Sequence, residues 1–173
     1  LVIGLITAIF GVIYAAIQSD MKRLLAYSSI ENIGVIFVGL GLALTFKSFM
    51  LPHLSALAMT AMLYHCLNHA CFKSLLFLST GSVLHATGER NLGKLGGLIH
   101  RMPWVAWLAL VGVLASAGLP PLNGFISEWL LLQSFLFTSS LPHGYLNMLL
   151  PAFAAAVALV AGRAKAFSLV VFY

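Results

Sequence analysis

The sequence predicts an all-α bundle of membrane-spanning helices, about five in number. Of its 173 residues, 61% are hydrophobic and only 8% are charged, and the mean hydropathy is +1.03. Ordinary soluble domains are about 45–50% apolar and about 25% charged. So few polar side chains cannot cover a soluble surface, which excludes a soluble enzyme, a disordered tail and a nucleic-acid binder. The net charge of +5 is interpreted as a signal of membrane topology.

Windows of about 20 apolar residues, the length that crosses a hydrocarbon core about 30 Å thick, set the number of spans. The five windows are residues 1–17, 24–46, 54–84, 104–137 and 146–162. The third is long enough that its helix is expected to tilt or overhang. The fourth contains Pro120 and Pro121, which remove two backbone donors and clash with the preceding turn. We therefore expect this span to break in its middle, at residues 118–124.

The lysine and arginine residues indicate which side of the membrane each loop faces. If the broken fourth segment crosses once, seven of them lie on one side and only Lys47 on the other; a hairpin gives five against three. The seven are Lys22, Arg23, Arg90, Lys94, Arg101, Arg163 and Lys165. The stronger asymmetry favours a single crossing. Loops 18–23, 85–103 and 163–165 are then expected to face the cytoplasm from a cell inner membrane, with Asp20 capping the helix that follows it.

Three titratable side chains of the third window share one helical face. His65, His69 and Lys73 follow i, i+4, i+8 spacing, so they line about 12 Å of a helix, with Asn68 beside them. Such a row can support a proton wire, because neutral imidazole both accepts and donates a hydrogen bond and a lysine in a low dielectric can lose its proton. The alternative is that the histidines only bond one helix to another. A lysine on the same face favours the functional interpretation.

The same segment also allows a metal site to be considered. His65 and His69 could chelate a cation together with Cys66 and Cys71. However, Cys66 lies off the histidine face, and Lys73 would place a positive charge beside the metal. We expect no metal site here and no redox cofactor in this chain.

Two of the four acidic residues, Glu31 and Glu128, lie within predicted spans. Glu128 is expected in the first turn of the half-helix that restarts after the prolines, where the helix end favours the carboxylate and burial favours the acid. The alternative is a glutamate that extends to the membrane interface. Glu31, with Tyr27 and Ser28 on its face, is a further candidate for a proton pathway. Its alternative role is a structural acid paired with a basic residue of another helix.

Three motifs, in this order, resemble the antiporter-like membrane subunits of respiratory complex I, Mrp-type cation/proton antiporters and energy-converting hydrogenases. They are QSDMKRLLAYSS at residues 18–29, the row of His65, His69 and Lys73, and GLPPLNGFISE at residues 118–128. The stretch SIENIG at 29–34 most resembles the hydrogenase-4 and formate hydrogenlyase membrane subunits. The resemblance implies a fourteen-helix protein with two inverted five-helix repeats, each broken in its fourth helix. Residues 1–173 would be one transmembrane domain, the second repeat, and a fragment of that larger subunit.

The resemblance also implies a function, namely proton translocation in a redox-driven complex of the hydrogenase or NADH-quinone oxidoreductase type. His65, His69 and Lys73 would belong to a central hydrophilic axis, Glu128 would be its terminal proton donor or acceptor, and Lys165 would extend it. The partners would be other membrane subunits, a peripheral redox arm and the lipid bilayer, and the chain would hold no catalytic redox site. Two other functions stay open: a stand-alone cation/proton antiporter subunit, and a structural membrane scaffold without transport.

Overall fold

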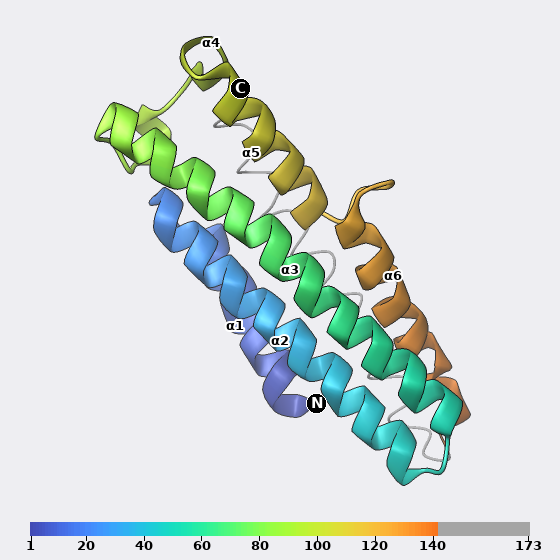
Figure 1. Ribbon diagram of the computed structural model, residues 1–173. Helices are drawn as coiled ribbons and strands as arrows, with labels where there is room; N and C mark the ends of the chain where they lie inside the picture. The colour runs from blue at the N-terminus through green and yellow to red at the C-terminus, as the bar shows by residue number, and fades with distance from the viewer. Residues whose placement is uncertain (142–173) are drawn as a thin grey trace.

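The structure, a computed structural model, describes residues 1–141, and the regular elements in that range are all helices (Figure 1). The α-helices are α1 (Val2–Ala16), α2 (Met21–Ser48), α3 (Pro52–Thr87), α4 (Leu98–Arg101), α5 (Pro103–Ser116) and α6 (Asn123–Leu136), and the short 3₁₀ helices are η1 (Leu92–Lys94) and η2 (Phe137–Ser140). The predicted all-α fold class is confirmed for this part of the chain. The fifth predicted window, 146–162, lies outside the described residues.

Helices α1 and α2 lie side by side because small residues line their contact (Figure 1). A Cβ atom added to Gly11 would lie 2.7 Å from the Cα atom of Glu31, and one added to Gly34 would lie 2.7 Å from the Cα atom of Ala8. Small residues allow helix backbones to approach this closely in an apolar environment. The backbone of Glu31 is therefore fixed against α1.

Local sequence signals set the ends of α2 and α3. The Asp20 carboxylate accepts hydrogen bonds from the backbone N–H groups of Lys22 (2.9 Å) and Arg23 (3.1 Å), which confirms the predicted cap. Pro52 begins α3, at a position where its missing N–H has no helical partner to lose. The helix ends at Gly88, which has a φ of 68°. Its 36 residues form one continuous helix about 54 Å long, so the third window extends well beyond the core of a bilayer.

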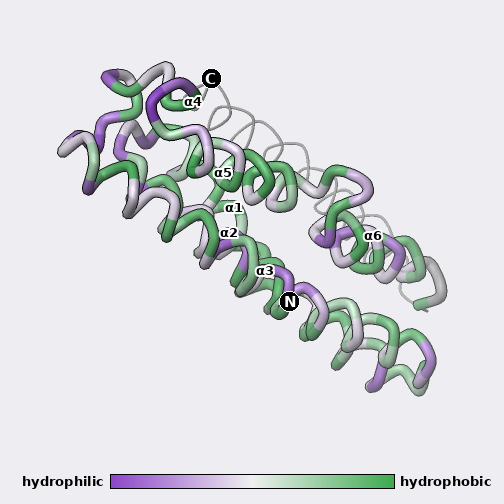
Figure 2. The backbone as a smooth tube through the Cα atoms, turned by 45° about the horizontal axis from the view of Figure 1, so that its top comes forward, coloured by the Kyte–Doolittle hydropathy of each residue, from purple (hydrophilic) through white to green (hydrophobic). Residues whose placement is uncertain are grey.

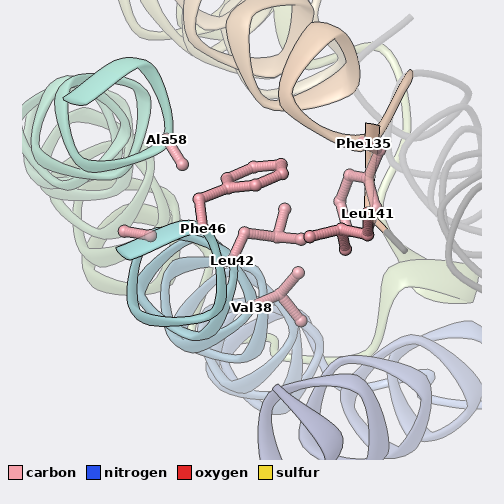
Figure 3. Close-up of a cluster of buried hydrophobic side chains, with 7 residues drawn as sticks. Val38, Leu42, Phe46, Ala58, Phe135 and Leu141 are labelled. Carbon is pink, nitrogen blue, oxygen red and sulfur yellow. The ribbon is translucent and has the colours of Figure 1, made fainter. Parts of the chain in front are cut away.

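Three apolar clusters hold the described part of the bundle: one lies toward each end, and a smaller one joins Leu25, Leu76 and Val113. Figure 3 shows the cluster near the turn between α2 and α3, where Phe46 and Leu42 of α2 lie between Ala58 of α3 and Phe135 of α6. The opposite cluster joins the first turn of α2 to the last turns of α3 and to α5, and its buried members are Met21, Leu24, Val83, Leu92, Leu98 and Ala109. Between the two end clusters, along α2 and α3, lie buried polar side chains that apolar packing does not explain.

The two connections with predicted cytoplasmic placement, 18–23 and 85–103, are joined at one end of the bundle. The backbone N–H of Met21 donates to the carbonyl of Arg90 (3.1 Å), and that of Leu92 donates to the carbonyl of Ser19 (2.9 Å). Figure 2 shows hydrophilic residues concentrated in this region. This contact is consistent with the prediction that both loops face the same side of the membrane.

By length and composition alone, α2 is the helix within residues 1–141 that is long and apolar enough to cross a membrane, and α1 and α5 are shorter apolar helices. Helices α5 and α6 both contact α3 and follow one another along it (Figure 1). The interruption between Ser116 and Asn123 confirms the predicted break in the fourth window.

Candidate functional site: a buried polar row beside a broken helix

The break between α5 and α6 depends on two glycines. Gly118 has a φ of 65°, a conformation that favours glycine, and turns the chain away from the end of α5. Gly124 lies against the carbonyl oxygen of Ala115, where a Cβ atom would overlap that oxygen. The N-terminus of α6 can therefore start directly against the last turn of α5. Pro120 and Pro121, between the glycines, prevent a continuous helix.

His65 lies at the centre of the polar row and bridges three helices. Only 1% of its surface is exposed. Its Nε2 atom lies 3.2 Å from Oδ1 of Asn32 on α2, and its Nδ1 atom lies 3.0 Å from Oγ of Ser127 on α6. Both partners are themselves fully buried. The imidazole is thus held in a fixed orientation between the middle of α2 and the second turn of the half-helix α6.

Asn68, one turn further along α3, both donates and accepts a hydrogen bond at the beginning of α6. Its Nδ2 atom donates to the backbone carbonyl of Asn123 (2.9 Å), and Nδ2 of Asn123 donates to Oδ1 of Asn68 (3.2 Å). Asn123 is the first residue of α6. Together, Asn68 and His65 attach the start of the half-helix to the middle of α3 through polar contacts.

Lys73 and His69 extend the row toward the other end of α3. Lys73 is 5% exposed, and its Nζ atom donates to the carbonyl of Leu25 on α2 at 3.4 Å. The His69 side chain is half-buried, and its ring lies nearly parallel to that of His65 with the centroids 6.5 Å apart. The structure therefore keeps the three predicted side chains on one face, with His65 contacting α2 and α6 and Lys73 contacting α2.

Glu31 is buried on α2, immediately before Asn32, with 2% of its surface exposed. The prediction that it lies within the bundle is confirmed, and Ser28, which was expected on its face, is buried as well. Tyr27 lies toward α1, where its ring stacks on that of Tyr14 with the centroids 5.4 Å apart.

Glu128 lies beside the helix break, but in the second turn of α6. The prediction of a first-turn position was wrong because the helix begins at Asn123, two residues after Pro121, which makes Glu128 its sixth residue. The charge at a helix end falls off within the first turn, so it contributes less to this carboxylate than was expected. The half-buried carboxylate instead lies over Gly118, where an added Cβ atom would be 3.0 Å from Cδ of Glu128.

Lys165 lies outside the described residues. The four side chains considered for a metal do not converge, since Cys71 is exposed whereas His65 is buried, and no group of three or more metal-ligating side chains forms within residues 1–141.

Sequence reasoning assigned no role to Asn32, Ser127 and Asn123, which the structure brings into the site. Each is a polar residue in or beside an apolar span, which was the available signal. Their partners lie 33, 62 and 55 residues away in the chain, so no local spacing could identify them.

Comparison with known proteins places this chain among membrane subunits. Residues 1–153 match the family model described as NADH:quinone oxidoreductase/Mrp antiporter, TM. The chain is 50% identical over 135 residues to formate hydrogenlyase subunit 3 of Escherichia coli K12, covering 78% of this chain and 22% of that protein. It is 46% identical over 132 residues to hydrogenase-4 component B of the same strain, covering 76% and 20%. A subunit of the Mrp complex from Dietzia sp. DQ12-45-1b has a similar structure, with a TM-score of 0.80 and 32% identity over 96% of this chain and 17% of that one. The chain thus spans about a fifth of the length of these relatives.

Proposed function

Because the chain belongs to the NADH:quinone oxidoreductase/Mrp antiporter membrane family, we propose that it is part of a proton-translocating membrane subunit of a redox-driven complex. The hydrogenase type is favoured by the two relatives at 50% and 46% identity, whose names are formate hydrogenlyase subunit 3 and hydrogenase-4 component B. The proposal treats residues 1–173 as the second five-helix repeat of a fourteen-helix subunit, which is consistent with the small share of each relative that the chain covers.

One observation carries the proposal: titratable side chains are buried in a helix of a membrane protein. His65 and Lys73 lie on one face of α3, beside α2, and Glu31 is buried on α2. A charged side chain at the centre of a bilayer costs about 2.5–3.5 kcal/mol on insertion scales. Apolar residues would hold these helices together without that cost. Groups that take up and release protons within the membrane explain why these side chains are present.

In this proposal the protons move along the face of α3 and reach the helix break. Lys73, His69 and His65 take up and release protons along this face, with Glu31 beside them on α2. Glu128, next to Ser127 on α6, is the terminal donor or acceptor. Lys165 is a further candidate for this pathway.

The proposed membrane arrangement has five spans, of which α5 and α6 together make one. Each of these two helices has 14 residues and is about 21 Å long, which is too short to cross a core of about 30 Å. Their succession along α3 favours one broken crossing over a hairpin (Figure 1). Loops 18–23, 85–103 and 163–165 would then face the cytoplasm. Other membrane subunits and a peripheral redox arm would be the partners, and the relatives' names, which call one a subunit and the other a component, support an assembly of several chains.

The test is the proton-to-electron stoichiometry of the full-length complex in membrane vesicles. Glu128→Gln and Lys73→Met each remove a titratable group and are expected to abolish or strongly slow coupled pumping while the complex still assembles. Glu89→Gln is the matched control, because Glu89 lies at the surface of the connection after α3. Unchanged stoichiometry in both variants would refute the proposal, and a loss of assembly with transport intact in the surviving complex would favour a structural scaffold.

A stand-alone cation/proton antiporter is the second candidate, favoured by the similarity to a subunit of the Mrp complex. It would exchange sodium for protons in vesicles that lack any electron donor. Measuring sodium-dependent proton exchange with the redox partners absent separates the two functions.

A further inference from the structure

The two ring nitrogens of His65 face partners of different chemistry. Nε2 lies 3.2 Å from the amide oxygen of Asn32, and Nδ1 lies 3.0 Å from the hydroxyl oxygen of Ser127. An amide oxygen only accepts a hydrogen bond, whereas a hydroxyl both donates and accepts. The two sides of the ring are therefore not equivalent for a proton.

The orientation of the Asn32 amide is fixed by a second contact. Its Nδ2 atom donates to the backbone carbonyl of Ser28 at 2.7 Å. A carbonyl oxygen has no hydrogen to donate, so the NH₂ group has to face Ser28 and Oδ1 has to face His65. Nε2 must then carry a hydrogen to bond Oδ1. This holds for the neutral ring and for the imidazolium, since both can keep a hydrogen on Nε2.

Ser127 has one hydroxyl hydrogen and two acceptors within reach. One is Nδ1 of neutral His65, and the other is the carbonyl of Gly124 at 3.0 Å in the first turn of α6. When the ring is neutral, the hydroxyl donates to Nδ1. When the ring is an imidazolium, Nδ1–H donates to Oγ and the hydroxyl hydrogen turns to the carbonyl of Gly124. The charge of His65 thus determines a hydrogen bond in the first turn of the half-helix.

We propose that Asn32 and Ser127 are positioning residues that make Nδ1 the proton port of His65, with Nε2 permanently protonated. To load the ring, the Ser127 hydroxyl transfers its hydrogen to Nδ1. Oγ takes a proton from a hydronium ion or a protonated carboxyl group on the α6 side, so one Oγ–H bond breaks and another forms. The ring gains one positive charge, and the serine stays a neutral hydroxyl. This inference deepens the proposed function and rests on it for the purpose of the transfer.

A consequence is that His65 is charged and discharged from the side of the helix break and does not pass protons across its ring to α2. The titratable groups on the neighbouring elements are Glu31 on α2, His69 and Lys73 on α3, and Glu128 on α6. Their charges determine the pH at which His65 becomes charged. The contacts of Asn32 and Ser127 determine which nitrogen takes up the proton.

The test is solid-state ¹⁵N NMR of histidine-labelled full-length subunit in its complex and in lipid, with His65→Gln used to assign the His65 signals by difference. The expected result is an Nε2–H tautomer for neutral His65, with protonation of Nδ1 on charging. Ser127→Ala is expected to slow coupled proton transport about tenfold or more, and Ser127→Thr to restore most of it, because threonine keeps the hydroxyl. Ser134→Ala is the matched control: Ser134 is equally buried on α6, and its hydroxyl donates to the carbonyl of Leu130 (2.9 Å).

A neutral Nδ1–H tautomer in the unsubstituted protein would overturn the inference, as would transport in Ser127→Ala equal to that in Ser134→Ala. The tautomer is read from the unsubstituted protein, and His65→Gln serves only to assign the signals, so the result decides the matter even if Ser127→Ala fails to assemble. The proposed function has its own test, which does not depend on the tautomer. It fails if Lys73→Met and Glu128→Gln both leave the proton-to-electron stoichiometry unchanged. Loss of pumping in those two variants together with an Nδ1–H tautomer would refute this inference alone.

Discussion

Replacing Asn68 by alanine should loosen the start of α6 from the middle of α3 by a calculable amount. The substitution removes two hydrogen bonds, from Nδ2 of Asn68 to the carbonyl of Asn123 and from Nδ2 of Asn123 to Oδ1 of Asn68. Hydrogen bonds between helices in membranes contribute about 0.6 kcal/mol each on average. Two of them give an expected loss of about 1.2 kcal/mol in the free energy of unfolding.

A double-mutant cycle with Asn123→Ala separates the two bonds. Asn123→Ala removes only the bond donated by its side chain, so it should cost about 0.6 kcal/mol. The double variant should be no less stable than Asn68→Ala, because the Asn123 side chain has already lost this partner. The expected coupling energy is therefore also about 0.6 kcal/mol.

The assay is equilibrium unfolding of the full-length subunit in bicelles, with SDS as the denaturant. Ser82→Ala is the control on the same helix, because the Ser82 hydroxyl is exposed and bonds only within α3, to the carbonyl of Leu78. A coupling energy below about 0.3 kcal/mol, within the error of additivity, would refute the reasoning that these two side chains clamp the break.

Three further substitutions or conditions give expected outcomes. Gly118→Ala places a Cβ atom against the Glu128 carboxylate and forces alanine to adopt a positive φ, so the free energy of unfolding should fall by about 1–2 kcal/mol and pumping should slow. Gly81→Ala is the control and should do neither, because nothing lies within 4 Å of its added Cβ. If the two variants behaved alike in thermal unfolding and in transport, this reasoning would be contradicted. Asp20→Ala should cost about 1 kcal/mol in unfolding free energy and Asp20→Asn much less, because asparagine also caps a helix. The backbone N–H of Asn91 donates to the Glu89 carboxylate and lowers the pKa of that carboxyl group from 4.5. The stabilisation of this loop is therefore complete above about pH 4.5 and is lost as the pH falls through the lower pKa of the folded state. Amide-exchange protection of Asn91, corrected for intrinsic rates, should fall on acidification, and protection independent of pH would contradict the assignment.

The helices and their ends could be predicted from the sequence because they depend on local chemistry. Apolar windows located α1, α2 and α3, a carboxylate at position 20 capped α2, and the pair of prolines at 120–121 broke the fourth window. One local prediction was wrong, the turn of α6 that carries Glu128, since helix starts are defined by single backbone hydrogen bonds that composition does not determine.

The composition and the i, i+4, i+8 spacing by themselves determined that residues 1–141 fold into helices and that His65, His69 and Lys73 share one face of α3. Which of these side chains contact which helix was decided only by the tertiary structure. The row bonds Asn32 on one neighbouring helix and Ser127 on the other because α2, α3 and α6 pack together at that level. Helix periodicity places residues a few positions apart on one face, whereas hydrogen bonds between residues 33 and 62 positions apart exist only once the helices have docked.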